Sequence, residues 1–182
     1  MLEHALQTAA EAGLGPIQLH CAPDAGHPAL RAAAARAGAI CLAQGSGDLG
    51  ERMRSALAAA LQHSPRALLL GTDCPALDAG ALREADAALA AGADSVFVPT
   101  ADGGFALTGF RCEALAAIDE VFAGIPWSTS TVMSVTRDHL LRADLRWTEL
   151  ATRVDADEPA DLIHVPPEWL EMVAGAPAAA NR

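Results

Sequence analysis

The sequence predicts an α/β fold in which helices flank a mostly parallel sheet. Along the first hundred residues, stretches with apolar residues at helical spacing alternate with short apolar runs. This alternation is typical of βαβ units with right-handed crossovers. Glycine and proline separate the stretches, and the abundant alanine favours helices. With no internal repeat and no linker, the chain is expected to form one domain over residues 1–173, followed by a flexible tail over 174–182.

The positions of the expected elements follow from these breaks. We predict helices at residues 2–12, 27–37, 49–63, 79–91, 113–118 and 130–142. We predict strands at residues 17–21, 39–43, 67–70, 94–99, 105–110 and 144–148. Pro28 suits the first turn of its helix, and Asp48 suits an N-cap.

The wholly apolar run at residues 67–70 predicts a buried parallel strand at the centre of the sheet. Ligands of open α/β sheets lie beyond the carboxyl ends of such strands, so Asp73 is expected at the rim of a crevice. Pro75 keeps Cys74 from continuing into a helix and leaves the carboxylate displayed. An aspartate there suits Mg²⁺, which takes one or two carboxylates besides phosphate and water. The alternative is that Asp73 only caps the following turn.

Charge and cysteine content limit the kinds of partner. The formal net charge is −11, from 12 basic and 23 acidic residues, and every basic residue is an arginine. A chain without a basic stripe does not suit a nucleic-acid backbone, so no nucleic-acid partner is expected. The four cysteines are dispersed, and neither a signal peptide nor an apolar run long enough to span a bilayer is present. These features predict a soluble, cytoplasmic protein with reduced thiols.

Two glycine-containing motifs are candidate binding elements. The first, residues 47–53, opens a helix whose N–H groups and dipole favour an anion, and Arg52 can add a bidentate phosphate contact. The alternative is that Asp48 simply belongs to an ordinary helix cap. In the second motif, Asp102 lies beside Gly103 and Gly104, which permit the close approach of a ligand. A tight hairpin explains this motif equally well.

Two later segments supply further polar groups. Trp127 can stack on a sugar or a base, and one hydroxyl of residues 128–131 is expected to cap the following helix. Asp155 and Asp157 could project a second carboxylate toward Asp73, although acidic loops are usually just solvated. The six histidines form no metal-binding or Ser-His motif, so zinc and serine hydrolysis have no support.

Five motifs, taken in order, resemble those of one bacterial family. They are Gly-Asp-Leu-Gly-Glu-Arg-Met (47–53), Gly-Thr-Asp-Cys-Pro-Ala-Leu (71–77), Ala-Asp-Gly-Gly-Phe-Ala-Leu-Thr-Gly (101–109), Pro-Trp-Ser-Thr (126–129) and Asp-Ala-Asp-Glu-Pro-Ala-Asp-Leu (155–162). Over roughly residues 40–165 the sequence resembles the GT-A-like glycosyltransferase family long catalogued as a domain of unknown function and often described as an rSAM/selenodomain-associated transferase.

The resemblance implies a GT-A fold, which is a Rossmann-like sheet that binds nucleotide-diphospho-sugars. It also implies kinship with sugar-1-phosphate nucleotidyltransferases and molybdenum-cofactor guanylyltransferases. By this resemblance Asp73 holds Mg²⁺ or Mn²⁺ together with Asp155 or Asp157. The Asp-Gly-Gly segment at 102–104 lies near the acceptor or the sugar.

The sequence departs from the family at its start. Family members begin with an apolar strand and a Pro-Gly…Lys-Thr-Arg loop that holds the nucleotide, and this sequence lacks that segment. Without the strand, the sheet is expected to expose an edge or a gap, which invites a homodimer or a partner strand. A smaller departure is the glutamate at 158, since the family usually has threonine before this proline.

The leading hypothesis is therefore a metal-dependent glycosyltransferase that uses a nucleotide-activated sugar. Asp102 orients the acceptor hydroxyl or acts as its base, and Asp73, Asp155 and Asp157 form the metal side. The substrate-binding residues are expected to be Asp48, Arg52, Gly103, Gly104, Trp127, Ser128 and Thr129. The alternatives are a nucleotidyltransferase of the same fold and a non-catalytic truncated member that acts as a binding or assembly module.

Overall fold

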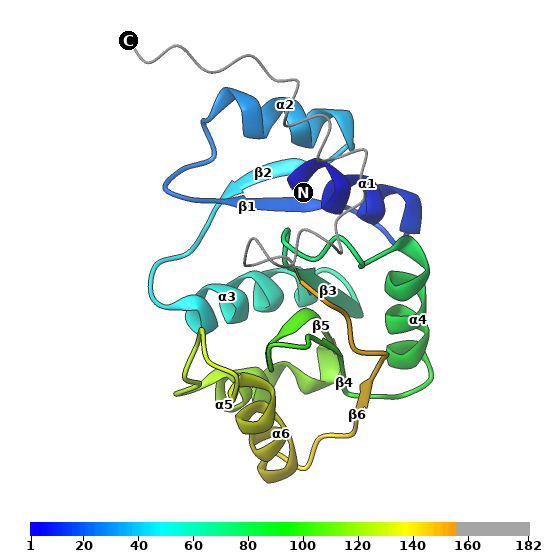
Figure 1. The fold of residues 1–182 in the computed structure, drawn as a ribbon, viewed down its shortest axis with the longest axis vertical. Helices are drawn as coiled ribbons and strands as arrows, with labels where there is room; N and C mark the ends of the chain where they lie inside the picture. The colour runs from blue at the N-terminus through cyan, green and yellow to red at the C-terminus, as the bar shows by residue number, and fades with distance from the viewer. Residues whose placement is uncertain (156–182) are drawn as a thin grey trace.

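A computed structural model describes residues 1–155 of the chain (Figure 1). Helices and strands alternate through most of its length. In chain order the elements are α1 (Leu2–Ala12), β1 (Gln18–Cys21), α2 (Pro28–Arg36), β2 (Ile40–Ala43), α3 (Leu49–Leu61), β3 (Arg66–Leu70), α4 (Ala79–Ala90), β4 (Ser95–Pro99), β5 (Phe105–Arg111), the 3₁₀ helix η1 (Cys112–Ala117), α5 (Ile118–Phe122), α6 (Val132–Arg142) and β6 (Trp147–Glu149).

Each predicted strand and helix is present, with ends that differ by a few residues. The helix expected at 113–118 is a 3₁₀ turn that continues into α5. The predicted hydroxyl cap of α6 is wrong, because the N-cap residue Thr131 makes no side-chain capping hydrogen bond. The hydroxyl of Thr129 instead donates to the carbonyl of Pro126 at 2.7 Å, which closes the loop before the helix.

The strands form two sheets. In the first, β1 pairs in parallel with β2, and α2 makes the crossover, so the predicted βαβ unit is confirmed. The second has the order β3-β5-β4-β6, in which β5 runs antiparallel to both of its neighbours and β6 runs parallel to β4. The predicted Rossmann-like arrangement of strands and helices is therefore confirmed, with antiparallel pairs at β5.

The expectation of a buried parallel strand after residue 66 is wrong in two respects. The partner of β3 is the antiparallel strand β5. All five residues of β3 are only half-buried, whereas all five residues of β4 are buried. The reason is that β3 pairs along one edge and faces a cavity along the other.

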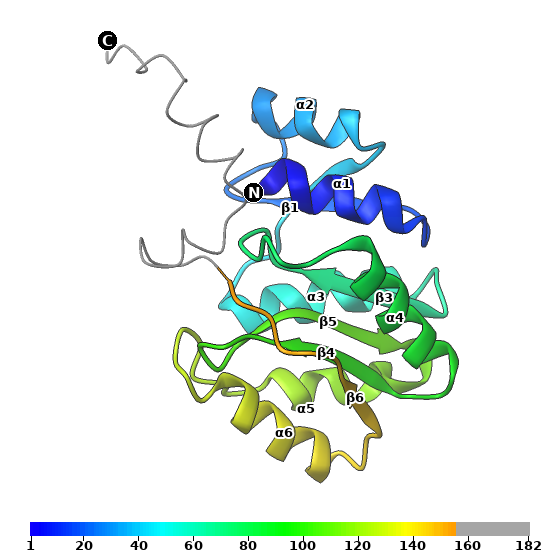
Figure 2. The same ribbon diagram turned by 45° about the vertical axis from the view of Figure 1, so that its right-hand side comes forward.

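Helices cover both faces of the four-stranded sheet. On one face, Phe97 and Phe110 pack with residues of α3, α5 and α6. On the other face, Val96 and Leu107 pack with residues of α4. Adjacent residues of β4 thus point to opposite cores, as the alternation of a strand requires. In Figures 1 and 2, α1, α2 and the β1–β2 sheet lie above this layered body.

Over residues 1–155, no helix is both long and apolar enough to cross a membrane.

Candidate functional site

A cavity of about 810 Å³ opens between the two sheets. At one end it is lined by loops that follow β3, β4 and β6, and by the loop that precedes α6. These loops bring together most of the predicted site residues, namely Arg52, Asp73, Asp102, Gly104, Trp127, Ser128, Thr129 and Asp155. Asp48 and Gly103 do not line the cavity. Asp157 lies outside the described residues.

Asp73 lies three residues beyond the end of β3, as the sequence predicted. The N–H of Gly71 donates to the carbonyl of Ala106 at 2.9 Å and holds the start of the loop against β5. A Cβ at residue 71 would come 2.6 Å from Oδ1 of Asp73, so the carboxylate folds back over this glycine. The capping role belongs to another residue: Asp78 begins α4 and accepts from the N–H of Ala81 at 2.8 Å. Asp73 is therefore left at the cavity.

Asp155 is held beside the Asp73 loop by contacts of its neighbours. The N–H of Arg153 donates to the carbonyl of Pro99 at 2.9 Å, which extends the sheet by one bridge beyond β6. The thiol of Cys74 donates to the carbonyl of Val154 at 3.6 Å. The acidic segment after β6 is therefore tied both to the end of β4 and to the loop after β3.

The thiol of Cys74 also reports that two carboxylates are near each other. Burial raises the pKa of Cys74, and the negative charges of Asp155 and Asp73 raise it further. A thiol that feels both charges must lie close to both groups, because Coulomb interactions weaken with distance. The two aspartates are 82 positions apart in sequence and meet at one point of the fold.

The donor set at this point suits a magnesium-type ion rather than a fully protein-built metal site. Residues 1–155 contain no group of three or more His, Cys, Asp or Glu side chains placed to hold a metal. Two carboxylates at an open cavity are what Mg²⁺ needs when substrate phosphates and water fill its other positions. Asp73 and Asp155 therefore fit the group that the family resemblance implies.

Asp102 sits in the tight turn between β4 and β5. Its Oδ1 accepts from the hydroxyl of Thr100 and from the N–H of Gly104 at 2.9 Å, so the carboxylate does close the turn. Oδ2 receives no hydrogen bond from any side chain or backbone group of residues 1–155 that we observe. One oxygen is thus structural and the other is directed to functional use.

Gly103 serves packing rather than the cavity. Its φ of 96° lies in the left-handed region, and a Cβ there would come 2.1 Å from the carbonyl oxygen of Ser130. Its own carbonyl accepts from the N–H of Met133 at 2.8 Å. The turn therefore presses backbone to backbone against the start of α6, and only glycine permits this approach.

Trp127 forms part of the cavity wall and part of the core. Its ring centroid lies 6.3 Å from Phe105 and 6.3 Å from Phe122. Its indole nitrogen is buried without a hydrogen-bond partner in the part of the chain that the structure describes. The indole is therefore more firmly packed than the loop position predicted, and it offers an edge rather than a free face.

The start of α3 resolves the alternatives at 47–53. Asp48 Oδ1 accepts from the N–H of Glu51, and Glu51 Oε2 accepts from the N–H of Asp48, both at 2.9 Å. This capping box uses the Asp48 side chain. Arg52 instead reaches the cavity, where it donates to Gln44 Oε1 at 3.2 Å. It forms no ion pair within residues 1–155, so its charge is available to an anion.

The loop before α6 carries local strain. Ser128 has a φ of 62°, which is unusual for a residue with a Cβ. Both Ser128 and Thr129 are exposed and line the cavity. Left-handed non-glycine residues of this kind gather at functional sites, where the surroundings impose them.

Comparison with known proteins places the sequence. The profile of the family described as "Uncharacterized protein conserved in bacteria (DUF2064)" matches residues 5–129. The chain belongs to this family. No curated protein matches the sequence.

Solved structures resemble this member of the family at two levels. The crystal structure of a "putative nucleotide-diphospho-sugar transferase" from Desulfovibrio desulfuricans matches with a TM-score of 0.75 and 26% identity, over 89% of this chain and 72% of that one. CMP:2-keto-3-deoxy-manno-octonic acid synthetase matches with a TM-score of 0.61 and 12% identity, over 95% of this chain and 87% of that one. A cytidylyltransferase from Leptospira borgpetersenii matches with the same TM-score and identity, over 95% and 81%. The two matches at 12% identity show a shared fold.

Sequence reasoning missed three residues that build the site of this family member. Gly50 makes room for Trp127, since a Cβ there would come 2.9 Å from its ring. Gly71 makes room for the Asp73 carboxylate, and Cys74 ties two loops together. All three lie inside motifs that the sequence marked as functional, but each acts through a neighbour that is distant or that only the folded loop brings near.

Proposed function

We propose that this chain is a divalent-cation-dependent transferase whose donor is a nucleotide-activated sugar. The observation that carries the proposal is the meeting of Asp73 and Asp155 beside an unpaired Arg52 at one cavity. Opposite charges placed in this way suit a cation and the phosphates that it binds. The match to the Desulfovibrio desulfuricans protein, described as a nucleotide-diphospho-sugar transferase, supports the choice of donor.

The residues divide the work as follows. A divalent cation held by Asp73 and Asp155 would supply charge neutralisation for the diphosphate leaving group. Asp157, which lies outside the described residues, would complete this shell. Arg52 binds a phosphate oxygen, and Trp127 with its two following hydroxyl residues lines the sugar side.

The transfer itself needs one proton acceptor. The acceptor's hydroxyl oxygen forms a bond to the anomeric carbon of the sugar, and the bond from that carbon to the diphosphate oxygen breaks. The nucleoside diphosphate leaves with the electron pair of that bond. The proton of the acceptor hydroxyl passes to Oδ2 of Asp102, since Oδ1 is already engaged by Thr100 and Gly104.

Calorimetric titration with UDP, GDP and CDP, with and without Mn²⁺, tests the proposal. We expect one of these diphosphates to bind only when Mn²⁺ is present. Asp73→Asn should weaken that binding at least tenfold, because it removes one charge from the cation. Asp138→Asn is the matched control, since Asp138 is exposed on α6, away from the cavity, and loses the same charge. Binding without Mn²⁺, or equal binding by Asp73→Asn, would contradict the assignment.

A product assay separates the two transfer reactions. Transfer from a nucleoside diphosphate sugar releases a nucleoside diphosphate, whereas nucleotidyl transfer from a triphosphate releases pyrophosphate. The fold shared with the cytidylyltransferase makes CTP the first triphosphate to test. Pyrophosphate release dependent on a sugar phosphate would replace our proposal with nucleotidyl transfer. A folded chain that binds no nucleotide would indicate a binding or assembly module.

A further inference from the structure

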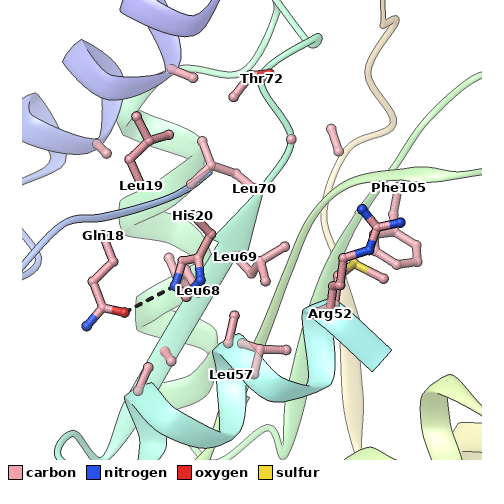
Figure 3. Close-up of a pocket in the computed structure, with 18 of the residues that line it drawn as sticks. Gln18, Leu19, His20, Arg52, Leu57, Leu68, Leu69, Leu70, Thr72 and Phe105 are labelled. Atoms are coloured by element: carbon pink, nitrogen blue, oxygen red, sulfur yellow. Dashed lines mark hydrogen bonds between the residues drawn. The ribbon is translucent and has the colours of Figure 1, made fainter. Parts of the chain in front are cut away.

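The polar loops occupy only one end of the cavity, and the rest is an apolar slot between β1 and β3. Figure 3 shows this part, with residues 18–20 of β1 near residues 68–70 of β3. The slot is lined mainly by aliphatic side chains, including Leu2, Leu6, Leu19, Leu57, Leu68 and Leu70. Burial lowers the pKa of His20, so its imidazole in the wall is neutral at pH 7.

Both strands present an edge to the slot. Consecutive side chains of a strand point to opposite faces of its sheet. Yet three consecutive residues of β1 and all five of β3 line the same cavity. A space bordered by successive residues lies beside a strand rather than above it. The slot is therefore flanked by two strand edges that face each other.

Helices form the other two walls. Residues of α1 that line the cavity recur at positions 2, 5, 6 and 9, and those of α3 recur at 49, 52, 53, 56, 57 and 60. Each set follows the i, i+3, i+4, i+7 spacing of one helix face. The slot thus has a strand edge on two sides and a mostly apolar helix face on the others.

The facing edges have unmet backbone groups. Within residues 1–155, β1 is hydrogen-bonded as a strand only to β2, and β3 only to β5. Each strand can form a ladder on both edges, and an unpaired edge beside an apolar space is a site for pairing with another chain. The gap between the sheets therefore has the ordinary requirements of one more strand.

We propose that the slot binds one extended peptide segment of about five consecutive apolar residues, which hydrogen-bonds to β1 on one side and to β3 on the other. The segment must be apolar at successive positions because its side chains meet α1 and α3 in turn. Its length follows from β3, whose five residues all border the slot. At one end the ion pair of Arg66 with Asp86 bounds the apolar stretch, and at the other Thr72 and Asp73 do.

The occupant is a segment outside residues 1–155. To enter the slot, a strand must be free along both edges, because it gains a neighbour on each side. Every strand among the described residues already has at least one partner. A second copy of the folded chain could therefore not insert any of these strands without first breaking its own sheet. This proposal does not depend on nucleotide binding at the polar end.

A synthetic peptide tests the slot in the full chain. The probe has five alternating valine and leucine residues flanked by arginines for solubility, and its control carries proline at the central position. Hydrogen-exchange mass spectrometry follows the backbone N–H groups of each strand. We expect the probe to slow exchange in β1 and β3 together by at least tenfold, with β4 unchanged. The proline peptide should bind at least tenfold more weakly, because it cannot donate at its centre.

Two variants locate the binding. Leu68→Asp places a charge in the slot and should abolish protection by the probe. Leu141→Asp is the control, because Leu141 is 64% exposed on α6 and does not line the cavity. The proline comparison, made on the unaltered chain, remains decisive if Leu68→Asp fails to fold. Four results would overturn the proposal: no binding, protection of one strand only, equal binding of the proline peptide, or slot protection that arises from dimerisation without peptide.

Discussion

Gly50 of α3 lies directly against the indole of Trp127. A Cβ at residue 50 would come 2.9 Å from Cζ2 of Trp127 and 2.9 Å from the carbonyl oxygen of Phe122. The capped start of α3 and the loop before α6, which are 77 positions apart, thus touch because one residue has no side chain. This contact fixes one wall of the cavity.

Gly50→Ala should therefore destabilise the protein although alanine is the better helix former. Overpacking against backbone and an aromatic ring costs about 1–3 kcal/mol, against a propensity gain of about 1 kcal/mol at most. We expect a net loss in urea unfolding and a changed tryptophan fluorescence. Gly45→Ala is the control, since its Cβ would meet Ser55 at an ordinary 3.5 Å. Equal stability of the two variants would show that the wall can move freely.

Arg52→Gln should weaken binding of a nucleoside diphosphate about tenfold and change the free energy of unfolding by less than about 0.5 kcal/mol. A charge-assisted hydrogen bond to phosphate is worth about 1.5–3 kcal/mol, while Arg52 has no ion pair to lose within residues 1–155. Arg54→Gln, on the same helix, removes an exposed pair with Asp119 and should leave binding unchanged. Titration calorimetry and urea unfolding of both variants make the comparison. Equal losses of affinity would indicate a general charge effect.

Asp94 should contribute stability that depends on pH. Burial alone would raise its pKa, but hydrogen bonds from Arg146 and Arg111 outweigh burial and lower the pKa below its usual value. A carboxylate with a lowered folded-state pKa stabilises the fold above its unfolded pKa of about 3.9 and loses this effect as the pH falls through the folded value. Asp94→Asn should cost about 2 kcal/mol at pH 7.

Urea unfolding of both forms at several pH values measures this contribution. The difference between Asp94→Asn and the unaltered chain should be constant from pH 7 to pH 5 and shrink below pH ~4. The Asp94 side chain is 15% exposed, so the effect should persist in salt better than that of a surface pair. A difference that grows on acidification would reverse the sign we assign.

Ser128→Gly should stabilise the fold and weaken substrate binding. The φ of 62° costs a residue with a Cβ about 1–2 kcal/mol, of which glycine returns part to unfolded-state entropy, leaving a gain of roughly 0.5 kcal/mol. The same change removes a hydroxyl from the cavity. Asp144→Gly, with a φ of 54° beyond the end of α6, should bring the gain without the loss. Thermal unfolding and titration of the two variants separate strain from binding.

The order of elements could be predicted from the sequence because it is written in local signals. Breakers such as the run from Gly13 to Pro16, and the apolar periodicity between them, are set by residues a few positions apart. The pairing of strands is not local. Nothing near residues 105–111 indicates that β5 lies between β3 and β4 and runs antiparallel to both, since register and neighbour choice depend on the whole core.

The site divides in the same way. Asp73 and Asp102 were predictable because each follows a recognisable strand. The roles of Asp48 and Gly103 were not, because a cap and a packing contact use the same residue types as a binding loop. The remaining residues of the acidic motif, from position 156 onward, lie outside the described residues, so Asp157 stays a prediction.

The division into two sheets has a consequence for how the molecule fails under stress. Within residues 1–155 no backbone hydrogen bond joins β1 or β2 to the four-stranded sheet. Such weakly joined parts open as separate cooperative units, and the one with fewer buried contacts opens first. Of the β1 and β2 residues, only Cys21 is buried, so heat should release this pair while the three loops with Asp73, Asp102 and Asp155 remain folded. The half that carries the charges can then outlast the half that covers them.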